Sequence, residues 1–252
     1  MEQRSERKPA RVVFGLLLGG MLLLIMVLVA WRAHHVRFFL AHGWETYQVV
    51  SVEPLTKDTK RPASWKSLTF DEIRFSVPTD GGIEMRTHPS PIGERDCPQI
   101  ELGSGRKLTV LYGNIQSSDV ESSVDYFRSL PPGIPPSRAK LVADVYAASP
   151  ESFHWMMPGD RLAELDFMLS QKQTVCMSNT EAVMIRQEDQ WDGLLTIFGN
   201  YASFAWESHD FRQGGSLLFE TPPGTDVEWI KQICETVQID LSRQESTNLP
   251  SE

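Results

Sequence analysis

The chain begins with a long uninterrupted apolar segment. From Val12 to Trp31 there are 20 residues without a charge, and a helix that rises about 1.5 Å per residue would cross the roughly 30 Å hydrocarbon core of a bilayer over this length. A cleaved signal has a shorter apolar region that ends in small residues, whereas here Leu28 is too large for a cleavage site. The pattern predicts an uncleaved transmembrane anchor, with a cleaved signal and a buried soluble helix as the alternatives.

Downstream of this segment, the apolar positions recur with a period of either two or 3.6 residues. Strand patterns occupy residues 70–78, 81–86, two runs within 98–113, 181–187, 194–199, 201–208 and 215–221. Helical patterns occupy residues 117–130, 137–148, 159–171 and 227–239. Strands that follow one another with only turns between them favour an antiparallel meander. The expected fold class is α+β: a single transmembrane helix, then one domain with an antiparallel sheet packed against helices.

These patterns divide the chain into five parts. We expect a cytoplasmic tail at residues 1–11 and a transmembrane helix at 12–31. A juxtamembrane segment with a linker follows at 32–66, then a globular α+β domain at 67–241 and a flexible tail at 242–252. Within the third part, residues 36–50 are expected to continue the anchor helix into the interface, with Trp44 and Tyr47 as amphipathic belt residues. The aperiodic stretch 51–66 is typical of a tether.

Two stretches of the domain carry a family resemblance. The opening strand with its proline reads "FSVPTD" (75–80), and the closing strand, prolines and helix read "LLFETPPGTDVEWIKQICETVQI" (217–239). Together they resemble the PsbP-like small α/β/α domains. The likeness covers only part of the chain, uses no invariant motif, and does not extend to the middle helical region. It implies an adaptor or accessory role and transfers no catalytic residue.

The positive charges beside the apolar segment set the expected orientation. Four cations precede it within 11 residues and two follow it within 20, namely Arg4, Arg7, Lys8 and Arg11 against Arg32 and Arg37. Because the more positive flank stays in the cytoplasm, we expect a cytoplasmic N-terminus and a C-terminal domain outside the cytoplasm, in the cell (inner) membrane. Further lysines and arginines between residues 57 and 66 keep the reverse orientation open.

The rest of the chain is acidic. Residues 1–37 hold six of the 24 Lys/Arg and two of the 33 Asp/Glu, which leaves 18 basic and 31 acidic residues and a net charge of −13. This balance argues against nucleic acid as a partner and against an anionic lipid surface as a docking site. An apolar content of 41% over this length is enough for one hydrophobic core.

Two residue pairs are candidates for specific contacts. Gly15 and Gly19 form a G-x-x-x-G spacing, which lets two membrane helices approach closely and makes a homodimer through the anchor a hypothesis; glycine is also simply common in such helices. Cys97 and Cys176 are the candidate disulfide, because Cys234 lies in an apolar helical pattern. Three unpaired thiols are the alternative.

The histidines and carboxylates match no catalytic or metal-binding motif. The chain contains no H-E-x-x-H, C-x-x-C, G-x-S-x-G or phosphate-binding glycine loop. We therefore predict no catalytic residue, no metal ligand and no cofactor. The acidic run at 188–192 around Trp191 is either a sugar or calcium site or a solvated turn. The aromatic stretch 149–162 either lines a groove or closes the core. The candidate binding surface comprises His154, Trp155, Asp160 and Trp191.

Three functional hypotheses follow. The favoured one is a single-pass, membrane-anchored, non-enzymatic binding or accessory domain outside the cytoplasm, whose partner is another envelope or membrane protein. The first alternative is an envelope hydrolase that uses His154 with Asp160 or the acidic run. The second is a ligand sensor or carrier, which would require a large apolar cavity.

Overall fold

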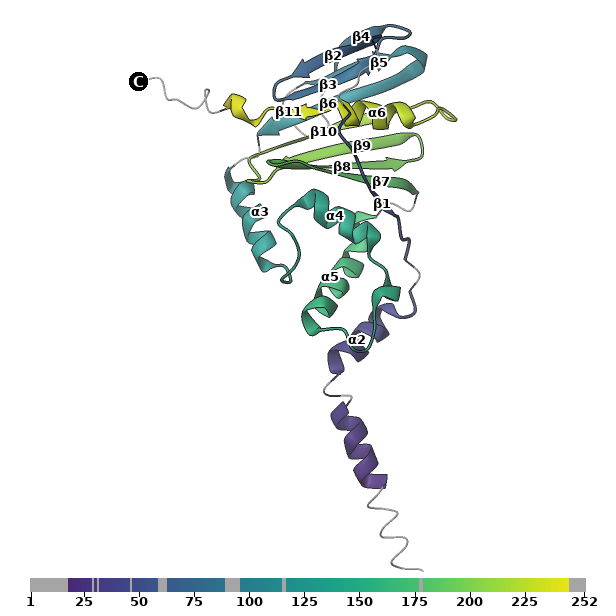
Figure 1. The fold of residues 1–252 in the computed structure, drawn as a ribbon, viewed down its shortest axis with the longest axis vertical. Coiled ribbons are helices and arrows are strands. Elements are labelled where there is room, and N and C mark those ends of the chain that lie inside the picture. Colours follow the sequence, from purple (N-terminus) through teal and green to yellow (C-terminus); the bar gives the residue numbers. More distant parts are fainter. Residues whose placement is uncertain are drawn as a thin grey trace, which may run out of the picture.

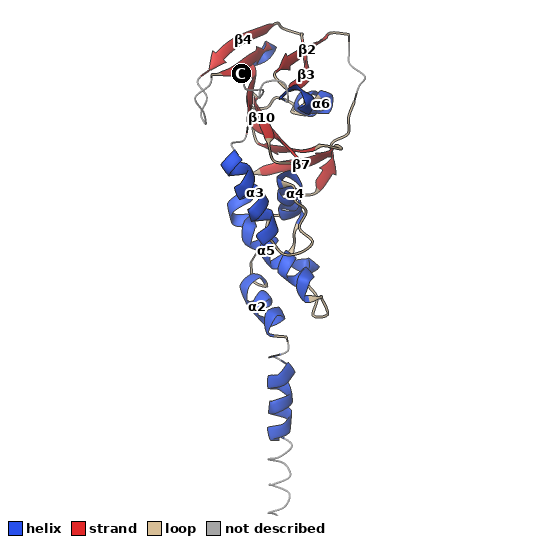
Figure 2. Cartoon of the chain, turned by 90° about the vertical axis from the view of Figure 1, so that its left-hand side faces the viewer, coloured by secondary structure: helices blue, strands red, loops and turns tan. Residues whose placement is uncertain are grey.

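The computed structural model describes residues 18–28, 30, 32–45, 47–58, 63–88, 96–114, 117–176 and 179–244. Within this part, the chain is an α+β protein, as the sequence predicts. A large sheet lies in the middle, a small sheet and one helix cover one of its faces, and the other helices lie on the opposite side, where one of them packs on the sheet (Figures 1 and 2).

The elements follow the predicted order closely. The helices are α2 (Ala33–His42), α3 (Ser117–Ser129), α4 (Arg138–Ala147), α5 (Gly159–Val175) and α6 (Glu228–Thr236). The strands are β1 (Val52–Pro54), β2 (Trp65–Phe70), β3 (Ile73–Pro78), β4 (Ile83–His88), β5 (Cys97–Leu102), β6 (Arg106–Asn114), β7 (Thr180–Gln187), β8 (Trp191–Phe198), β9 (Tyr201–Ser208), β10 (Gln213–Glu220) and β11 (Gln238–Ile239).

The large sheet has eight strands in the order β1-β7-β8-β9-β10-β6-β5-β4, and the small one has the order β11-β3-β2. The predicted meander is confirmed, because β7 to β10 pair antiparallel in succession. The predicted hairpin of β5 and β6 is also confirmed; its turn has Ser104 at φ 71° and Gly105 at φ 74°. The expectation of one antiparallel sheet is wrong, since β1 pairs parallel with β7 and makes the large sheet mixed.

The segment expected to be a tether contributes to the domain instead. Val52–Pro54 forms β1, and the next backbone N–H, that of Leu55, donates to the carbonyl of Ile185 at 2.8 Å. The Leu55 side chain is buried in the main core. A three-residue strand has too few positions to show a period of two residues. The sequence pattern therefore does not predict that Val52–Pro54 pairs with β7.

The main core lies between the large sheet and the layer formed by the small sheet with α6. Helix α6 forms because Ile230, Ile233 and Val237 recur at helical spacing, and all three are fully buried there. Phe204 of β9 is also fully buried, and Gly193 of β8 makes room for it: a Cβ on that glycine would lie 2.6 Å from the Phe204 ring. Each such side chain contributes about 1.5–3 kcal/mol by leaving water.

The opposite face of the large sheet carries helices stacked in sequence. Ala139, Ala143 and Tyr146 of α4 pack on Val183 and Leu194 of the sheet. Helix α5 packs on α4, and α2 packs on α5. The helices therefore lie between the sheets and the N-terminal segment, and the sheets form the end of the molecule far from that segment (Figures 1 and 2).

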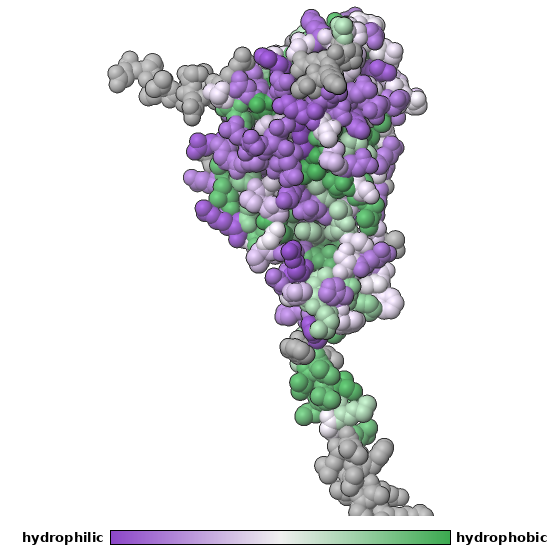
Figure 3. Space-filling model, in the orientation of Figure 1, coloured by the Kyte–Doolittle hydropathy of each residue, from purple (hydrophilic) through white to green (hydrophobic). Residues whose placement is uncertain are grey.

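Before α2 lies an apolar helix, Leu18–Leu28, whose large side chains are all exposed. Figure 3 shows it as a green stalk below a domain whose sheet end is mostly hydrophilic. Among the described residues no single helix has the length and apolarity to cross a bilayer; the pair Leu18–Leu28 and Ala33–His42 meets both criteria jointly, across a bend of 71°. Much of the predicted span, residues 12–17, 29 and 31, lies outside the described residues.

Candidate functional site at the α2–α5 junction

Helix α2 folds back onto the domain. His35, Phe38 and His42 recur at i, i+3 and i+7, which places them on one helix face, and all three are buried against the domain. Phe38 joins a small apolar cluster with Leu162, Leu165 and Leu169 of α5, and with Ala148. The expected continuation of the anchor helix through residues 36–50 therefore ends at His42, and the helix is part of the domain.

A polar cluster fixes α2 to α5. The ring of His42 contacts the Tyr47 hydroxyl at 2.7 Å through Nδ1 and the Asp166 carboxylate at 2.9 Å through Nε2. The Tyr47 hydroxyl also donates to the Glu45 carboxylate. Burial, together with the nearby Glu45 carboxylate, raises the pKa of Tyr47 well above its usual value, so this hydroxyl stays protonated as a hydrogen-bond donor.

This His–carboxylate pair has the geometry of a clamp. A general base needs a ring nitrogen that can reach the proton of a substrate. Both ring nitrogens of His42 already have partners, and the ring is buried. The cluster therefore links three segments of the chain and offers a substrate no unengaged nitrogen.

A shallow groove runs beside the clamp. It has a volume of about 140 Å³ and is lined by His34, Arg37, Phe38, Gly159, Leu162, Ala163 and Asp166. Sites for drug-sized ligands have volumes of about 300–1,000 Å³. The groove is thus too small to enclose such a ligand, and it does not favour the carrier hypothesis.

Part of the predicted binding surface lies at this junction. The Trp155 ring lies 6.2 Å from the ring of Phe39 and 5.3 Å from that of Phe153, and Phe153 stacks on Phe38 at 4.9 Å. Trp155 itself is 51% exposed. Phe153 therefore helps to close the small core, and Trp155 faces outward.

The other predicted site residues are not brought together with Trp155. His154 and Asp160 are both exposed, and no hydrogen bond or ion pair joins these two described side chains. Trp191 is only 5% exposed and lies in the main core, with its ring 6.4 Å from that of Phe204. The structure thus separates the four predicted residues into an exposed loop and a core position.

Two carboxylates of the acidic run at 188–192 have basic side chains as neighbours. Glu188 accepts from the guanidinium of Arg186 at 2.7 Å, and the Asp192 carboxylate lies 3.5 Å from Nε2 of His209. Among the described residues, no group of three or more His, Cys, Asp or Glu side chains is arranged to hold a metal ion. The run lies at the turn between β7 and β8, where Trp191 and Asp192 are buried.

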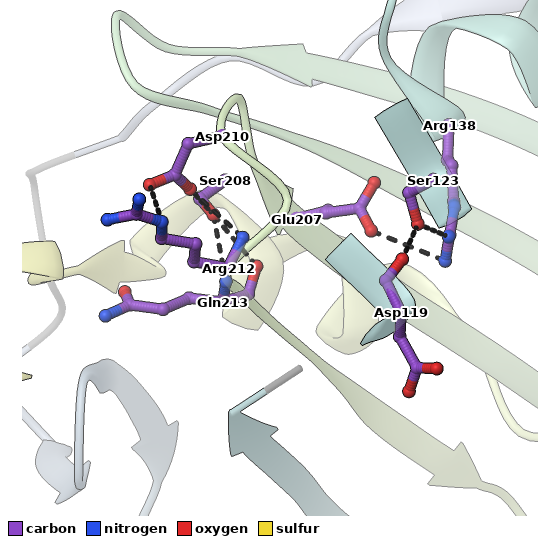
Figure 4. A network of polar contacts seen from close by, with 8 residues as sticks. All are labelled: Asp119, Ser123, Arg138, Glu207, Ser208, Asp210, Arg212 and Gln213. Atoms are coloured by element: carbon purple, nitrogen blue, oxygen red, sulfur yellow. Dashed lines mark hydrogen bonds and ion pairs between the residues drawn. The ribbon is translucent and has the colours of Figure 1, made fainter. Parts of the chain in front are cut away.

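A second polar cluster joins the helical layer to the large sheet (Figure 4). Arg138, at the start of α4, donates to Ser123 of α3 and lies 3.4 Å from the Glu207 carboxylate on β9. Ser123 in turn donates to the carbonyl of Asp119 at 2.7 Å. Burial raises the pKa of Glu207, and the nearby Arg138 charge only partly offsets this.

The neighbouring part of Figure 4 is the β9–β10 turn. Ser208 donates to the Asp210 carboxylate at 2.6 Å and accepts from the backbone N–H of Gln213 at 3.0 Å. Burial of Asp210 opposes ionisation, but hydrogen bonds from Ser208 and from the Arg212 backbone outweigh it and lower the pKa of this carboxyl. These contacts are local to the turn, as expected for an Asx-type structure.

The candidate disulfide and the candidate helix pair have different outcomes. Cys97 lies on β5 and Cys176 follows the end of α5, so they belong to different layers, and the cysteines are thiols. A bridge between them would require large backbone movements.

Gly15 lies outside the described residues. A Cβ on Gly19 would meet nothing within 4 Å, and pairing of two helices through these glycines stays a prediction.

Sequence reasoning missed the clamp itself. The sequence pattern assigns His42 to the membrane-proximal segment, and Asp166 is 124 residues away from it in the chain. The available signal was the apolar-aromatic face of residues 35–42, which indicates a helix that packs on another part of the protein.

Comparison with family models, with curated proteins and with solved structures finds no match to this chain, and so does not bear on the PsbP-like resemblance.

Proposed function

We propose that this chain is a single-pass membrane protein that holds a non-enzymatic binding or accessory domain at the outer surface of the cell (inner) membrane. The observation that supports it most is the helix Leu18–Leu28. Its large apolar side chains are all exposed, so they pack on no part of the domain that the structure describes. An apolar surface of this kind requires lipid or protein around it.

The sequence extends this helix to the length of a span. The charge-free run from Val12 to Trp31 has the length that a bilayer requires. The excess of positive charge before it supports a cytoplasmic N-terminus. The domain then lies outside the cytoplasm, where its net charge of −13 (18 basic and 31 acidic residues beyond residue 37) keeps it soluble.

A binding role is supported by the character of the polar clusters. The histidine–carboxylate pairs described above connect structural elements, and the groove beside them is small. Within the described part of the chain, a protein partner has an available strand edge: β4 lies at the end of the large sheet, and Met85 on it is 57% exposed. An edge strand pairs readily with an added strand.

Membrane insertion is tested first. The double variant Leu22→Arg/Ile25→Arg places two charges within the apolar helix, at a cost of about 2.5–3.5 kcal/mol each near the bilayer centre. We expect the variant to leave the membrane fraction upon alkaline extraction, whereas the matched control Leu22→Val/Ile25→Val stays in it. Extraction of both proteins, or of neither, would count against the anchor.

Orientation and partner are tested in intact cells. Added protease is expected to digest the C-terminal domain of the full chain but not an N-terminal tag. A photoreactive residue at Met85 is expected to form a discrete cross-link to another membrane protein, whereas one at Tyr201, which is similarly exposed (52%), should not. Protection of the domain would reverse the topology, and equal labelling from both positions would remove β4 as the partner site.

A further inference from the structure

We propose that the domain lies directly on the bilayer surface through a docking patch formed by Phe39, Leu40, Trp44, Trp155 and Met156, whose side chains enter the interfacial region of the lipid. This proposal rests on the membrane anchoring proposed above and adds the position of the domain relative to the lipid. It also assigns these residues a partner: the headgroup–acyl boundary of the bilayer.

The three aromatic residues of the patch lie next to one another, and their chain neighbours Leu40 and Met156 are exposed beside them. The Phe39 ring lies 5.7 Å from the Trp44 ring and 6.2 Å from the Trp155 ring. Leu40, Trp44 and Met156 are 67%, 78% and 76% exposed. Isolated exposed apolar residues are ordinary, but a contiguous group with two tryptophans marks an interaction surface.

The chain connection keeps this patch close to the membrane. Helix α2 begins five residues after Leu28, the last residue of the apolar helix, so the two ends are at most about 18 Å apart. The Arg32 N–H donates to the Leu28 carbonyl at 3.0 Å, which makes the actual connection tighter. Arg32 also contacts the Met156 sulfur at 3.7 Å, which places the 155–156 loop beside the end of the apolar helix.

The bend between the helices lays α2 along the surface. With the apolar helix upright in the bilayer, a bend of 71° means that the seven steps from Ala33 to Leu40 rise only about 3 Å away from the membrane. The headgroup region on each side of the hydrocarbon core is about 5–7 Å thick. Leu40 and its neighbours therefore lie within the depth that interfacial aromatic residues occupy.

The chemistry of the patch favours lipid over an acidic or basic protein. Tryptophan and phenylalanine partition into the interface of zwitterionic lipid by burying apolar area. Cations and carboxylates both flank the patch, among them Arg37, Asp160 and Asp166. Because these charges offset one another, docking should depend little on salt concentration and on anionic lipid.

The test uses the full chain in nanodiscs of phosphatidylcholine with brominated acyl chains, which quench nearby tryptophans. The protein has seven tryptophans. We expect lipid to quench Trp31 in the anchor together with Trp44 and Trp155. In the variant Trp44→Phe/Trp155→Phe, the quenched emission should therefore fall from three of the seven tryptophans to one, while the far-ultraviolet circular dichroism is unchanged. The matched control, Trp65→Phe on distant β2, should leave the quenched emission as it is.

The outcomes separate the two proposals. In one outcome, the double variant and the wild type show the same quenched emission, and this emission disappears when Trp31→Phe is added. That outcome would keep the anchor and overturn the docking. The patch would then belong to a protein partner. Absence of quenching in all variants would overturn the anchor and the docking together. Quenching of Trp44 and Trp155 that vanishes in concentrated salt would overturn the apolar mode of docking.

Discussion

The two ends of the domain are held together in different ways. The sheet end has one large apolar core, in which side chains such as Phe75, Phe204 and Phe219 are fully buried. The helical end has smaller apolar clusters and relies on buried polar links. For example, the Lys172 ammonium donates to the carbonyls of Gln48 at 2.7 Å and Tyr146 at 2.8 Å, and burial lowers its pKa.

The difference indicates what each end contributes. Apolar burial is non-directional and gives the sheets most of their stability. Buried hydrogen bonds add little net energy each, but they are costly to break and they fix one arrangement. The helical end thus fixes the arrangement of α2 on the domain, and the sheet end provides the stable body.

The largest expected effect comes from the sheet core. Phe204→Ala should lower the free energy of unfolding of the full chain in nanodiscs by about 3–5 kcal/mol, because it leaves a cavity between the sheets. Urea denaturation measures it. Tyr201→Ala, on the same strand but 52% exposed, should cost about 1 kcal/mol or less. Similar losses in both variants would mean that this core does not dominate stability.

A smaller and local effect is expected at the clamp. His42→Ala removes contacts to Tyr47 and Asp166 and should cost about 1–3 kcal/mol. Hydrogen exchange should accelerate in α2 and leave β8 to β10 unchanged, since the loss affects only the helical end. His34→Ala, an exposed histidine on the same helix, is the control and should change neither. Faster exchange throughout the sheet would show that the two ends unfold together.

The smallest effect concerns the link between the two ends. Burial raises the pKa of Glu207 above its ordinary value of 4.5, so the native state binds the proton more tightly than the unfolded state does. The stability contribution of this group is complete below pH 4.5 and is lost as the pH rises through the folded pKa. Relative to Glu207→Gln, the wild type should therefore become less stable as the pH rises above 4.5. A constant difference across this range would contradict the prediction.

The folded elements themselves were largely predictable. The meander at 180–220 has alternating residues and short turns, and α6 has a clear apolar stripe, because both carry their pattern in neighbouring residues. The candidate surface was predicted only in part. Trp155 stands in a run of aromatic and methionine residues that favours a surface or a core role, and it is exposed, whereas Trp191 beside the acidic run is a core residue.

Local pattern alone thus determined the apolar N-terminal run, the α+β class, and the order and approximate bounds of most helices and strands. Each of these follows from the spacing of side chains along a single segment. The tertiary structure decided the parallel pairing of β1 with β7, the clamp between His42 and Asp166, and the contact between the rings of Phe39 and Trp155. These contacts join segments more than 100 residues apart, and the spacing within one segment carries no information about the distant segment that packs on it.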